Sequence, residues 1–238
     1  MRARVRFEKN GIMRYVGHLD LMRFFQKAVK RSNLPIKYSE GFNPHQIMSF
    51  ASPLGVGLTS AGEYMDIDLK EHVHVEDALK ALNENMVEGL LITGFKYLPD
   101  EAQKCMSAVT AASYIVTYKD SKDDACYIDN ICDLKEKFFD EAASINIVKK
   151  TKKGERELDL KPLIYRFNIS ISDGVPVYDL LLSSGSTDNI KPELVIKAFH
   201  EFLGLPEFDE LSLDIRRIDM YTGEPEAFVS LGAIGDEH

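Results

Sequence analysis

The order of hydrophobic periodicities in the first hundred residues constrains the fold more than any other feature of this sequence. Residues 2–8 alternate between apolar and mostly basic side chains, which is the two-residue period of a half-buried strand. Residues 19–32 carry apolar side chains at helical spacing. Further periodic segments predict strands at 36–39, 47–51, 63–69 and 90–98, and a helix at 75–87. Strand, helix, strand or hairpin, strand, helix and strand in this order predict a ferredoxin-like β-α-β-β-α-β domain.

The second half of the chain repeats this theme more loosely after a polar stretch around residues 99–104. Its periodic segments predict strands at 112–118, 145–149, 163–172, 177–182 and 211–221, and helices at 130–143 and 192–203. Residues 150–157 are interpreted as a charged turn, and the tail after Ser230 is expected to be loose. We therefore predict an α+β protein of two ferredoxin-like β-α-β-β-α-β halves, as a duplication would produce. The expected domains are a basic N-terminal one over 1–100 and an acidic C-terminal α+β one over 108–225.

Positive charge is concentrated in the first sixty residues, although the whole chain has a formal charge of −9. Ten Lys and Arg against three Asp and Glu give Met1–Ser60 a charge of +7, which leaves −16 for the other 178 residues. The overall acidity argues against a general nucleic-acid coat protein. It leaves room for a local basic face, because steering of a polyanion depends on the local field. The acidic second half suits a protein partner better than RNA.

Two groups of cations make up the basic region. Arg2, Arg4 and Arg6 fall on the outer face of the first predicted strand. On the predicted helix, cations recur at i, i+4, i+7 and i+8, namely at Arg23, Lys27, Lys30 and Arg31. Such groups can neutralise phosphates, although most charged stripes of this kind are solvated helix faces. Aromatic side chains lie in the same region and would stack on bases if they were exposed, with core packing as the alternative: Tyr15, Tyr38, Phe42 and Phe50.

Two histidines lie among these residues. His18 is placed at the start of the predicted helix, two residues before Asp20, and His45 ends the loop Gly41-Phe42-Asn43-Pro44-His45. Glycine permits positive φ and Asn before Pro favours a turn, so this loop can hold His45 in one orientation. A histidine pair with an acid can do acid–base chemistry, whereas two histidines so far apart are a weak metal signal. A rigid turn with a hydrogen-bonded histidine is the plainest interpretation, ligand or nucleic-acid binding the next, and catalysis the least favoured.

Other motifs exclude several classes of site. The glycine-rich stretch 52–60 lacks G-x-G-x-x-G, and the stretch 183–189 lacks G-K-[ST], so neither predicts a dinucleotide or Walker site. Cys105, Cys126 and Cys132 include no C-x-x-C pair, so we expect neither a disulfide framework nor a metal cluster. No apolar run is long enough to span a membrane and no signal-peptide core is present, so a cytoplasmic protein is expected.

Three motifs resemble the radical SAM-linked protein family, a bacterial domain of unknown function that occurs free-standing or fused behind a radical SAM enzyme. They are Tyr15–Arg23, Tyr38–His45 and Gly62–Ile67, and the likeness extends over about the first 200 residues, including Lys161–Ile164 and 183–192. Gln46 departs from the family, since relatives often carry a second proline there. The resemblance implies an association with radical SAM chemistry and, through neighbouring genes, with RNA processing. The chain lacks C-x-x-x-C-x-x-C and would therefore act as a partner of the enzyme.

The combined prediction is an accessory RNA-binding protein that presents tRNA or rRNA to a radical SAM enzyme, with no cofactor, metal or catalytic residue of its own. The predicted binding residues are Arg14, His18, Asp20, Arg23, Lys27, Lys30, Arg31, Phe42, Asn43 and His45. One alternative is an enzyme that uses His18 and His45 for RNA cleavage or small-molecule transfer, which requires both imidazoles in one cleft. The other alternative is a protein-binding scaffold, which a flat apolar patch would favour.

Overall fold

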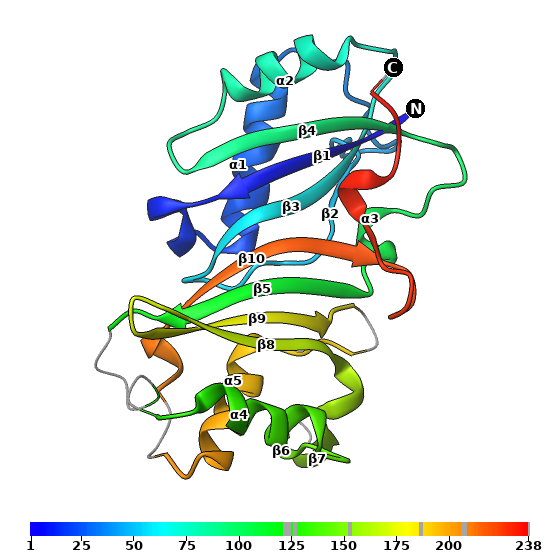
Figure 1. The fold of residues 1–238 in the computed structure, drawn as a ribbon. Coiled ribbons are helices and arrows are strands. Elements are labelled where there is room, and N and C mark those ends of the chain that lie inside the picture. The colour runs from blue at the N-terminus through cyan, green and yellow to red at the C-terminus, as the bar shows by residue number, and fades with distance from the viewer. Residues whose placement is uncertain (121–124, 126–127, 152–153, 186–187, 206–208, 238) are drawn as a thin grey trace. The chain divides into compact units, whose positions relative to one another are not determined.

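The computed structural model forms two compact units (Figure 1). It describes every residue except 121–124, 126–127, 152–153, 186–187, 206–208 and 238. Unit 1 consists of Met1–Thr110 together with Arg217–His238, and unit 2 consists of Ala111–Arg216. Within the described part of the chain, none of the helices combines the length and the apolar composition that a membrane crossing requires.

Unit 1 is a mixed sheet-and-helix unit. Its elements are β1 (Arg2–Lys9), the 3-10 turn η1 (Gly11–Tyr15), α1 (His18–Arg31), β2 (Met48–Phe50), β3 (Thr59–Asp68), α2 (Val75–Asn83), β4 (Leu90–Leu98), α3 (Cys105–Ala108), the later part of β10 (Leu213–Thr222), β11 (Val229–Ser230) and the 3-10 turn η6 (Leu231–Ala233). Its strands run in the order β4-β1-β3, with β2 beside one end of β3 and β10 also beside β3. The pairs β1–β4, β1–β3 and β2–β3 are antiparallel.

The core of unit 1 follows directly from the two periodicities. The apolar residues of β1 are at most 1% exposed, and Phe7 packs against Phe25 of α1 with ring centroids 4.7 Å apart. On α1 the buried residues recur at i, i+4, i+7 and i+8: Leu21, Phe25, Ala28 and Val29. The helix ends where Asn33 takes a left-handed φ of 56°. This burial leaves the opposite, charged side of α1 exposed.

Unit 2 also mixes helices with a largely antiparallel sheet. Its elements are β5 (Ala111–Tyr118), α4 (Ile131–Lys135) with a π-helical turn η3 (Glu136–Asp140), β6 (Asn146–Thr151), β7 (Gly154–Asp159), the 3-10 turn η4 (Lys161–Leu163), β8 (Ile164–Ser172), β9 (Val175–Ser183), α5 (Pro192–Phe202), the 3-10 turn η5 (Glu210–Ser212) and the first part of β10. The strand order is β10-β5-β9-β8, and β6 and β7 form a separate two-stranded sheet. Aromatic side chains of α5, β8 and β9 fill its core, with Phe167 and Phe199 rings 5.4 Å apart.

The prediction of a chain that combines helices with a mostly antiparallel sheet is confirmed. Three local predictions are wrong. Residues 36–39 do not form a strand but make isolated bridges, of Ile36 with Leu69 and of Tyr38 with Gln46. Residues 154–159 form strand β7 rather than a turn. The tail after Ser230 is not loose: Leu231 is fully buried, and Asp236 exchanges backbone hydrogen bonds with Tyr97 at 2.8 and 3.0 Å. The tail is held because it pairs with a strand distant in the sequence.

Candidate nucleic-acid interface

The exposed side of α1 carries the predicted helical cations. Arg23, Lys27, Lys30 and Arg31 are all exposed. Arg23 forms an ion pair with Asp20 at 3.1 Å, but both side chains are 71% exposed, so the pair contributes little to stability. Neither Lys27 nor Lys30 forms an ion pair with any residue that the structure describes. Two of the four cations are therefore available to an external anion without breaking an internal contact.

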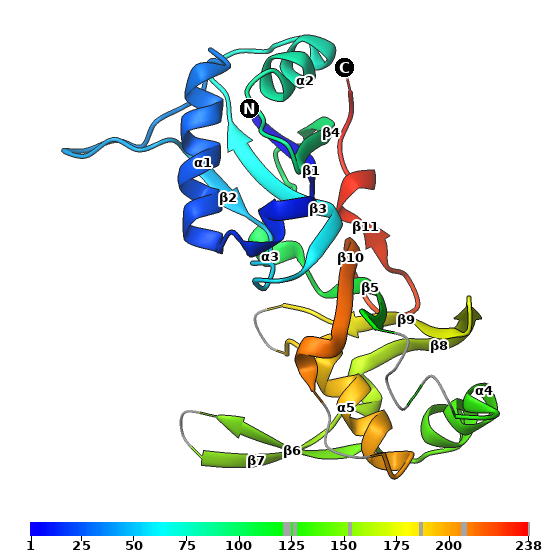
Figure 2. The same cartoon turned by 90° about the vertical axis from the view of Figure 1, so that its left-hand side faces the viewer.

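Residues 38–46 form a projecting arm between α1 and β2. Figure 2 shows this arm, in light blue, extending beyond α1 on the side away from the sheet. Tyr38 and Gln46 pair at its base, and the Ser39 amide donates to the His45 carbonyl at 2.8 Å. At the exposed end, Gly41 has a φ of 110°, which favours glycine. The arm is thus a short hairpin-like loop with a defined base and a solvated tip.

The tip and base of the arm present different chemistry. Phe42 is completely exposed at the tip, and Asn43 beside it is exposed too. At the base, Ser39 Oγ lies 2.8 Å from His45 Nδ1 and accepts the His45 amide N–H at 3.1 Å. The contact at Nδ1 orients the His45 ring, the amide contact holds its backbone, and neither involves Nε2.

A pocket of about 330 Å³ lies between α1 and the arm, and we call it the arm pocket. It is lined by Gln26, Lys27 and Lys30 of α1 and by Tyr38, Pro44, His45 and Gln46 of the arm. The structure therefore brings together Lys27, Lys30 and His45, three of the predicted binding residues. It adds Gln46, which the sequence interpretation did not select. One recess thus combines an aromatic ring, an amide and two lysines that form no ion pair within the described part of the chain.

His18 lies in a second pocket of about 350 Å³ between α1 and β2. Its lining is mainly apolar and rich in methionine: His18, Met22, Gln26, Met48, Ser49, Phe50, Ala51, Pro53 and Met106. Burial lowers the pKa of His18, an effect that Glu63 opposes and Lys9 reinforces. His18 and His45 line different pockets, which share only Gln26. The two-histidine enzyme would require both imidazoles in one pocket, and neither pocket contains both.

Arg14 has a local structural contact. Its Nε donates to the Gly57 carbonyl at 2.9 Å, and its own carbonyl accepts the Gly57 amide at 2.8 Å. These hydrogen bonds fix the glycine-rich loop after β2 against η1. Arg14 is not among the residues that line the arm pocket.

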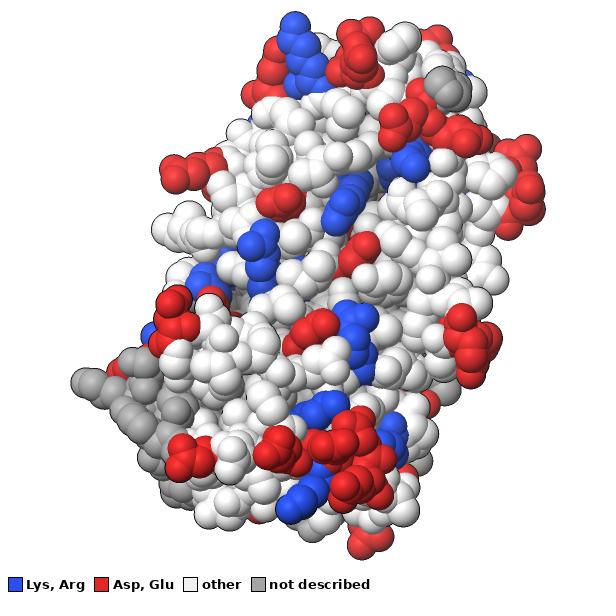
Figure 3. Space-filling view, viewed as in Figure 1, with Lys and Arg blue, Asp and Glu red and all other residues white. Residues whose placement is uncertain are grey.

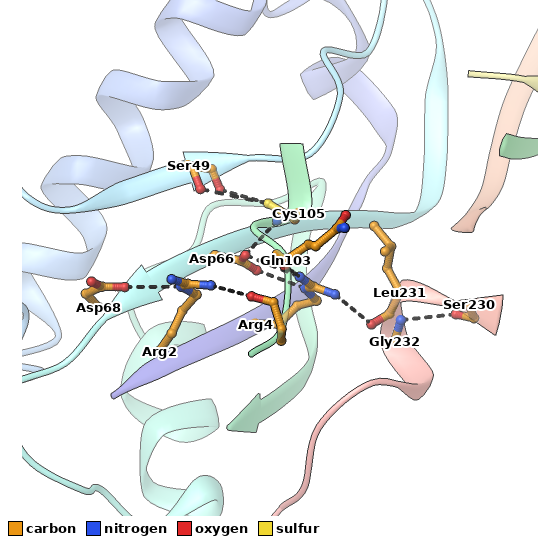
Figure 4. Close-up of polar contacts among 11 residues, drawn as sticks. Arg2, Arg4, Ser49, Asp66, Asp68, Gln103, Cys105, Ser230, Leu231 and Gly232 are labelled. Carbon is orange, nitrogen blue, oxygen red and sulfur yellow. Dashed lines mark hydrogen bonds and ion pairs between the residues drawn. The ribbon is translucent and has the colours of Figure 1, made fainter. Parts of the chain in front are cut away.

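The predicted outer face of arginines on β1 is wrong for Arg4. Arg4 is 3% exposed and forms a two-pronged ion pair with Asp66 of β3, at 2.9 and 3.2 Å (Figure 4). Arg2 lies 3.7 Å from Asp68 and donates to the Ala102 carbonyl at 2.9 Å. The reason is the antiparallel register, which sets Arg2 opposite Asp68 and Arg4 opposite Asp66. These arginines hold the unit together instead of facing a polyanion.

Figure 3 shows the sheet face that is turned away from α1, and the distribution of charges on it agrees with this pairing. Lys and Arg side chains there are interspersed with Asp and Glu instead of forming one basic patch. Arg6 lies on this face at a small pocket of about 180 Å³ that Lys96 and Glu237 also line. The alternating acids of β3 were the sequence signal for this neutralisation.

The structure contains a second buried ion pair that the sequence analysis did not predict. Arg217 of β10 contacts both carboxylate oxygens of Glu63, at 2.6 and 2.7 Å, and donates to the Ser52 carbonyl at 2.9 Å. Lys9 is 1% exposed beside this pair and donates to the Val16 carbonyl at 2.9 Å. Burial lowers the pKa of Lys9, and the nearby Arg217 acts in the same direction. Glu63 compensates part of the charge of both cations.

The cysteines carry no disulfide in the described residues. Cys105 and Cys132 are free, and Cys126 lies outside the described residues. Burial raises the pKa of the Cys105 thiol to about 12, and its amide donates to Asp66 at 2.7 Å. Among the described residues, no three or more His, Cys, Asp or Glu side chains are grouped as a metal site would require.

Comparison with known proteins gives a family and a distant structural likeness. No curated protein matches the sequence. The chain is similar to one in the crystal structure of a Cbf5–Nop10–Gar1 complex, with 10% identity and a TM-score of 0.48 over 92% of this chain. The match covers 48% of that protein, so the present chain spans about half of its length. Residues 2–192 match a family described as "Uncharacterized protein conserved in bacteria (DUF2344)", and because this match spans most of the sequence, the chain belongs to that family.

Proposed function

We propose that this protein binds single-stranded RNA through α1 and the arm, as an accessory to a radical SAM enzyme that modifies tRNA or rRNA. The observation that carries the binding role is the arm pocket, where Lys27 and Lys30 lie without ion-pair partners among the described residues beside Tyr38 and His45. Phosphate contacts by Lys and Arg supply most of the sequence-independent affinity of such proteins.

The cations of α1 suit a single phosphate backbone. Lys27 and Lys30 are three residues apart, so their side chains lie next to each other on the helix surface. Arg23 and Arg31 extend the same surface in both directions along α1. A strand that lies along α1 would therefore meet up to four cations, of which Arg23 is also within reach of Asp20.

Aromatic side chains of the arm supply the second element of the proposal. Phe42 is fully exposed and Tyr38 is 42% exposed, so both offer ring faces on which bases can stack. Phe50, in contrast, is partly buried and packs against the core cluster, with its ring centroid 5.6 Å from that of Phe25. Of the predicted stacking residues, Phe42 and Tyr38 are therefore the exposed ones on the arm, and Tyr15 is an exposed one outside it.

The radical SAM partner is inferred from the family resemblance of the Tyr15–Arg23, Tyr38–His45 and Gly62–Ile67 motifs. Four exposed apolar side chains of unit 1 suit a protein contact: Ile12, Tyr15, Leu19 and Val56, which are 62–75% exposed. The mutual hydrogen bonds between Arg14 and Gly57 hold together the segments that carry Tyr15 and Val56. The same side chains would also serve the scaffold function considered as an alternative.

We further propose that the chain is a duplication of a ferredoxin-like half. The strand neighbours β4-β1-β3-β2 of unit 1 and β10-β5-β9-β8 of unit 2 both correspond to the order 4-1-3-2 within their own half. In each half the extra hairpin, the arm or β6–β7, lies between the first helix and the second strand of the pattern. The two proposed domains correspond to these halves.

Fluorescence anisotropy with short labelled single-stranded RNA at low salt tests the binding role. The double variant K27Q/K30Q should weaken binding and reduce the slope of log affinity against log salt by about 1.4, since each lost phosphate contact removes about 0.7. The matched control is K70Q/K80Q, which removes the same charge from two exposed lysines elsewhere in unit 1. Absence of RNA affinity at low salt, or equal losses in both double variants, would overturn the proposal.

Crosslinking in cells tests the accessory role separately. The expected result is recovery of both an RNA and a radical SAM enzyme on the protein. Recovery of RNA without such an enzyme would keep the binding role and remove the accessory role.

A further inference from the structure

Arg6 and Lys96 line the small pocket of about 180 Å³ on the sheet face of unit 1, which we call the Arg6 pocket. Both side chains are partly buried, and neither forms an ion pair or a hydrogen bond with any residue that the structure describes. Removing a cation from water is costly unless an anion replaces the lost hydration. Two such cations in one recess therefore point to an anionic ligand.

The antiparallel register of β1 and β4 places the two cations beside each other. Arg6 pairs with Gly94 and Arg4 with Lys96, so Lys96 is a diagonal neighbour of Arg6 on the same face of the sheet. Like charges this close repel each other, and an anion between them would turn the repulsion into two attractions. Gly94 leaves the space above this position open, since a Cβ there would lie 3.3 Å from Arg6 Cβ.

The terminal nitrogens of Arg6 are the ones that can reach a ligand. Its Nε is closed to solvent, whereas Nη1 and Nη2 are not among the buried unpaired atoms. Because these two nitrogens form no hydrogen bond within the described part of the chain, both must be accessible to solvent. A guanidinium presents such a pair of N–H groups as a fork that fits two oxygens of a phosphate, and an ammonium adds a point charge.

The charges that line the Arg6 pocket leave it positive. Arg4 also lines it, but its two-pronged ion pair with Asp66 neutralises it. Glu237 is the one acid among the described lining residues, and it is exposed and pairs with no described cation. Arg6, Lys96 and Glu237 therefore sum to +1.

A further carboxylate, of Asp219, lies next to Tyr64 in the pocket wall and is occupied internally. It accepts from the hydroxyls of Tyr64 and Ser230 and from the Met220 amide. Burial raises the pKa of Tyr64, Asp219 reinforces this rise, and Arg6 opposes it. The charge of Arg6 therefore acts close to the Tyr64 hydroxyl, inside the pocket.

We propose that the Arg6 pocket binds a phosphate group, free or carried as a monoester by a small molecule, in addition to the RNA-binding role above. Nη1 and Nη2 of Arg6 contact two phosphate oxygens, and Lys96 Nζ contacts another. The volume lies below the range of about 300–1,000 Å³ for drug-sized ligands, which suits a group of phosphate size. Every lining residue belongs to unit 1.

Isothermal titration calorimetry at constant ionic strength, with inorganic phosphate and with glycerol 3-phosphate, tests the proposal. K96Q should weaken binding about tenfold or more, the effect of one hydrogen bond between charged groups. E237Q should strengthen binding about threefold, because it removes the acid that competes for the cations. The matched controls K70Q and E226Q change exposed residues of unit 1 outside the pocket and should leave the affinity unchanged.

The two ligands distinguish the sources of the phosphate group. Tighter binding of glycerol 3-phosphate assigns the pocket to a monoester, and equal affinities assign it to the free anion. Absence of binding by both ligands, or equal affinities of K96Q and wild type, overturns the proposal. R6K, which keeps the charge and removes the fork, should also weaken binding, and circular dichroism checks that each variant is folded.

Two further measurements separate this site from the RNA surface. K27Q/K30Q should bind phosphate as tightly as wild type, and a loss there would place the anion on α1 and overturn the proposal. Saturating oligo(U) should leave the phosphate affinity unchanged. Displacement of phosphate by the oligomer would assign the Arg6 pocket to the RNA surface and overturn a separate site. Failure of all RNA binding would remove the proposed function and leave the phosphate titrations as the test of this inference.

Discussion

Replacement of Arg4 by methionine should destabilise the protein strongly, because it leaves Asp66 as a buried charge without its cation. The Arg4 and Asp66 side chains are 2% and 3% exposed, and two hydrogen bonds of 2.9 and 3.2 Å join them. Removing one partner of such a pair costs about 3–5 kcal/mol. Arg4 also donates to the carbonyls of Gln103 and Leu231, so the variant loosens both segments as well (Figure 4).

A double variant separates the cost of the buried charge from the cost of the lost hydrogen bonds. R4M/D66L removes both charges, and an apolar pair of similar volume is often as stable as a buried ion pair. The double variant should still be less stable than wild type by about 1–3 kcal/mol, because the Cys105 amide loses its acceptor at Asp66. It should nevertheless be more stable than R4M.

Urea unfolding followed by far-ultraviolet circular dichroism measures these differences, since the chain contains no tryptophan. The control is R23M, which removes an exposed arginine and should change the unfolding free energy by less than about 0.5 kcal/mol. A cost for R4M below about 1 kcal/mol would refute the reasoning. It would mean that Arg4 faces solvent, as the strand pattern alone predicts.

Three further predictions follow from individual contacts. Phe42→Ala should leave the melting temperature unchanged, because the ring is fully exposed, and should weaken RNA binding by about 1–3 kcal/mol, the value of one stacked base; an unchanged affinity in the anisotropy assay would exclude stacking on Phe42. His18 should make the unfolding free energy rise with pH up to about 6.5, because its pKa is lower in the folded protein and the unfolded chain therefore binds more protons in this range. Urea unfolding at several pH values should show a smaller rise for H18Q than for wild type, and equal rises would contradict the prediction. Gly62→Ala should destabilise unit 1 by about 1–3 kcal/mol, because a Cβ there would lie 2.5 Å from the Ile218 carbonyl oxygen; urea unfolding with G55A as the uncrowded control checks this, and equal midpoints would contradict it.

Local periodicity was sufficient for most elements of the fold. The strand predicted at 90–98 has the same bounds as β4, in which buried and exposed side chains alternate over the first four residues. Residues 2–8 lie within β1, where apolar and polar residue types alternate. Strand β7 was not predicted because its residues lack such a pattern. In the described part of the chain it pairs with β6 alone, in a two-stranded sheet, so it needs no regular apolar face against a core.

The residues of the candidate site also divide into those that local sequence signals predict and those that they do not. The cations of α1 and the loop Gly41–His45 were visible in the sequence because helix spacing and turn residues are local signals. The burial of Arg4 was not, because its partner Asp66 lies 62 residues away and only strand register brings the two together.

The charge count of the first sixty residues therefore overstates the surface available to a polyanion. Of its ten cations, Arg2 and Arg4 are paired with acids of β3, and Lys9 is buried beside Glu63. Of the other seven, the four on α1 make the proposed phosphate contacts, and four contacts give a salt slope of about −3 for single-stranded RNA. Contacts by all ten cations would give about −7. A measured slope near the larger value would mean that the arginines of β1 leave their carboxylate partners to bind RNA, which their burial opposes.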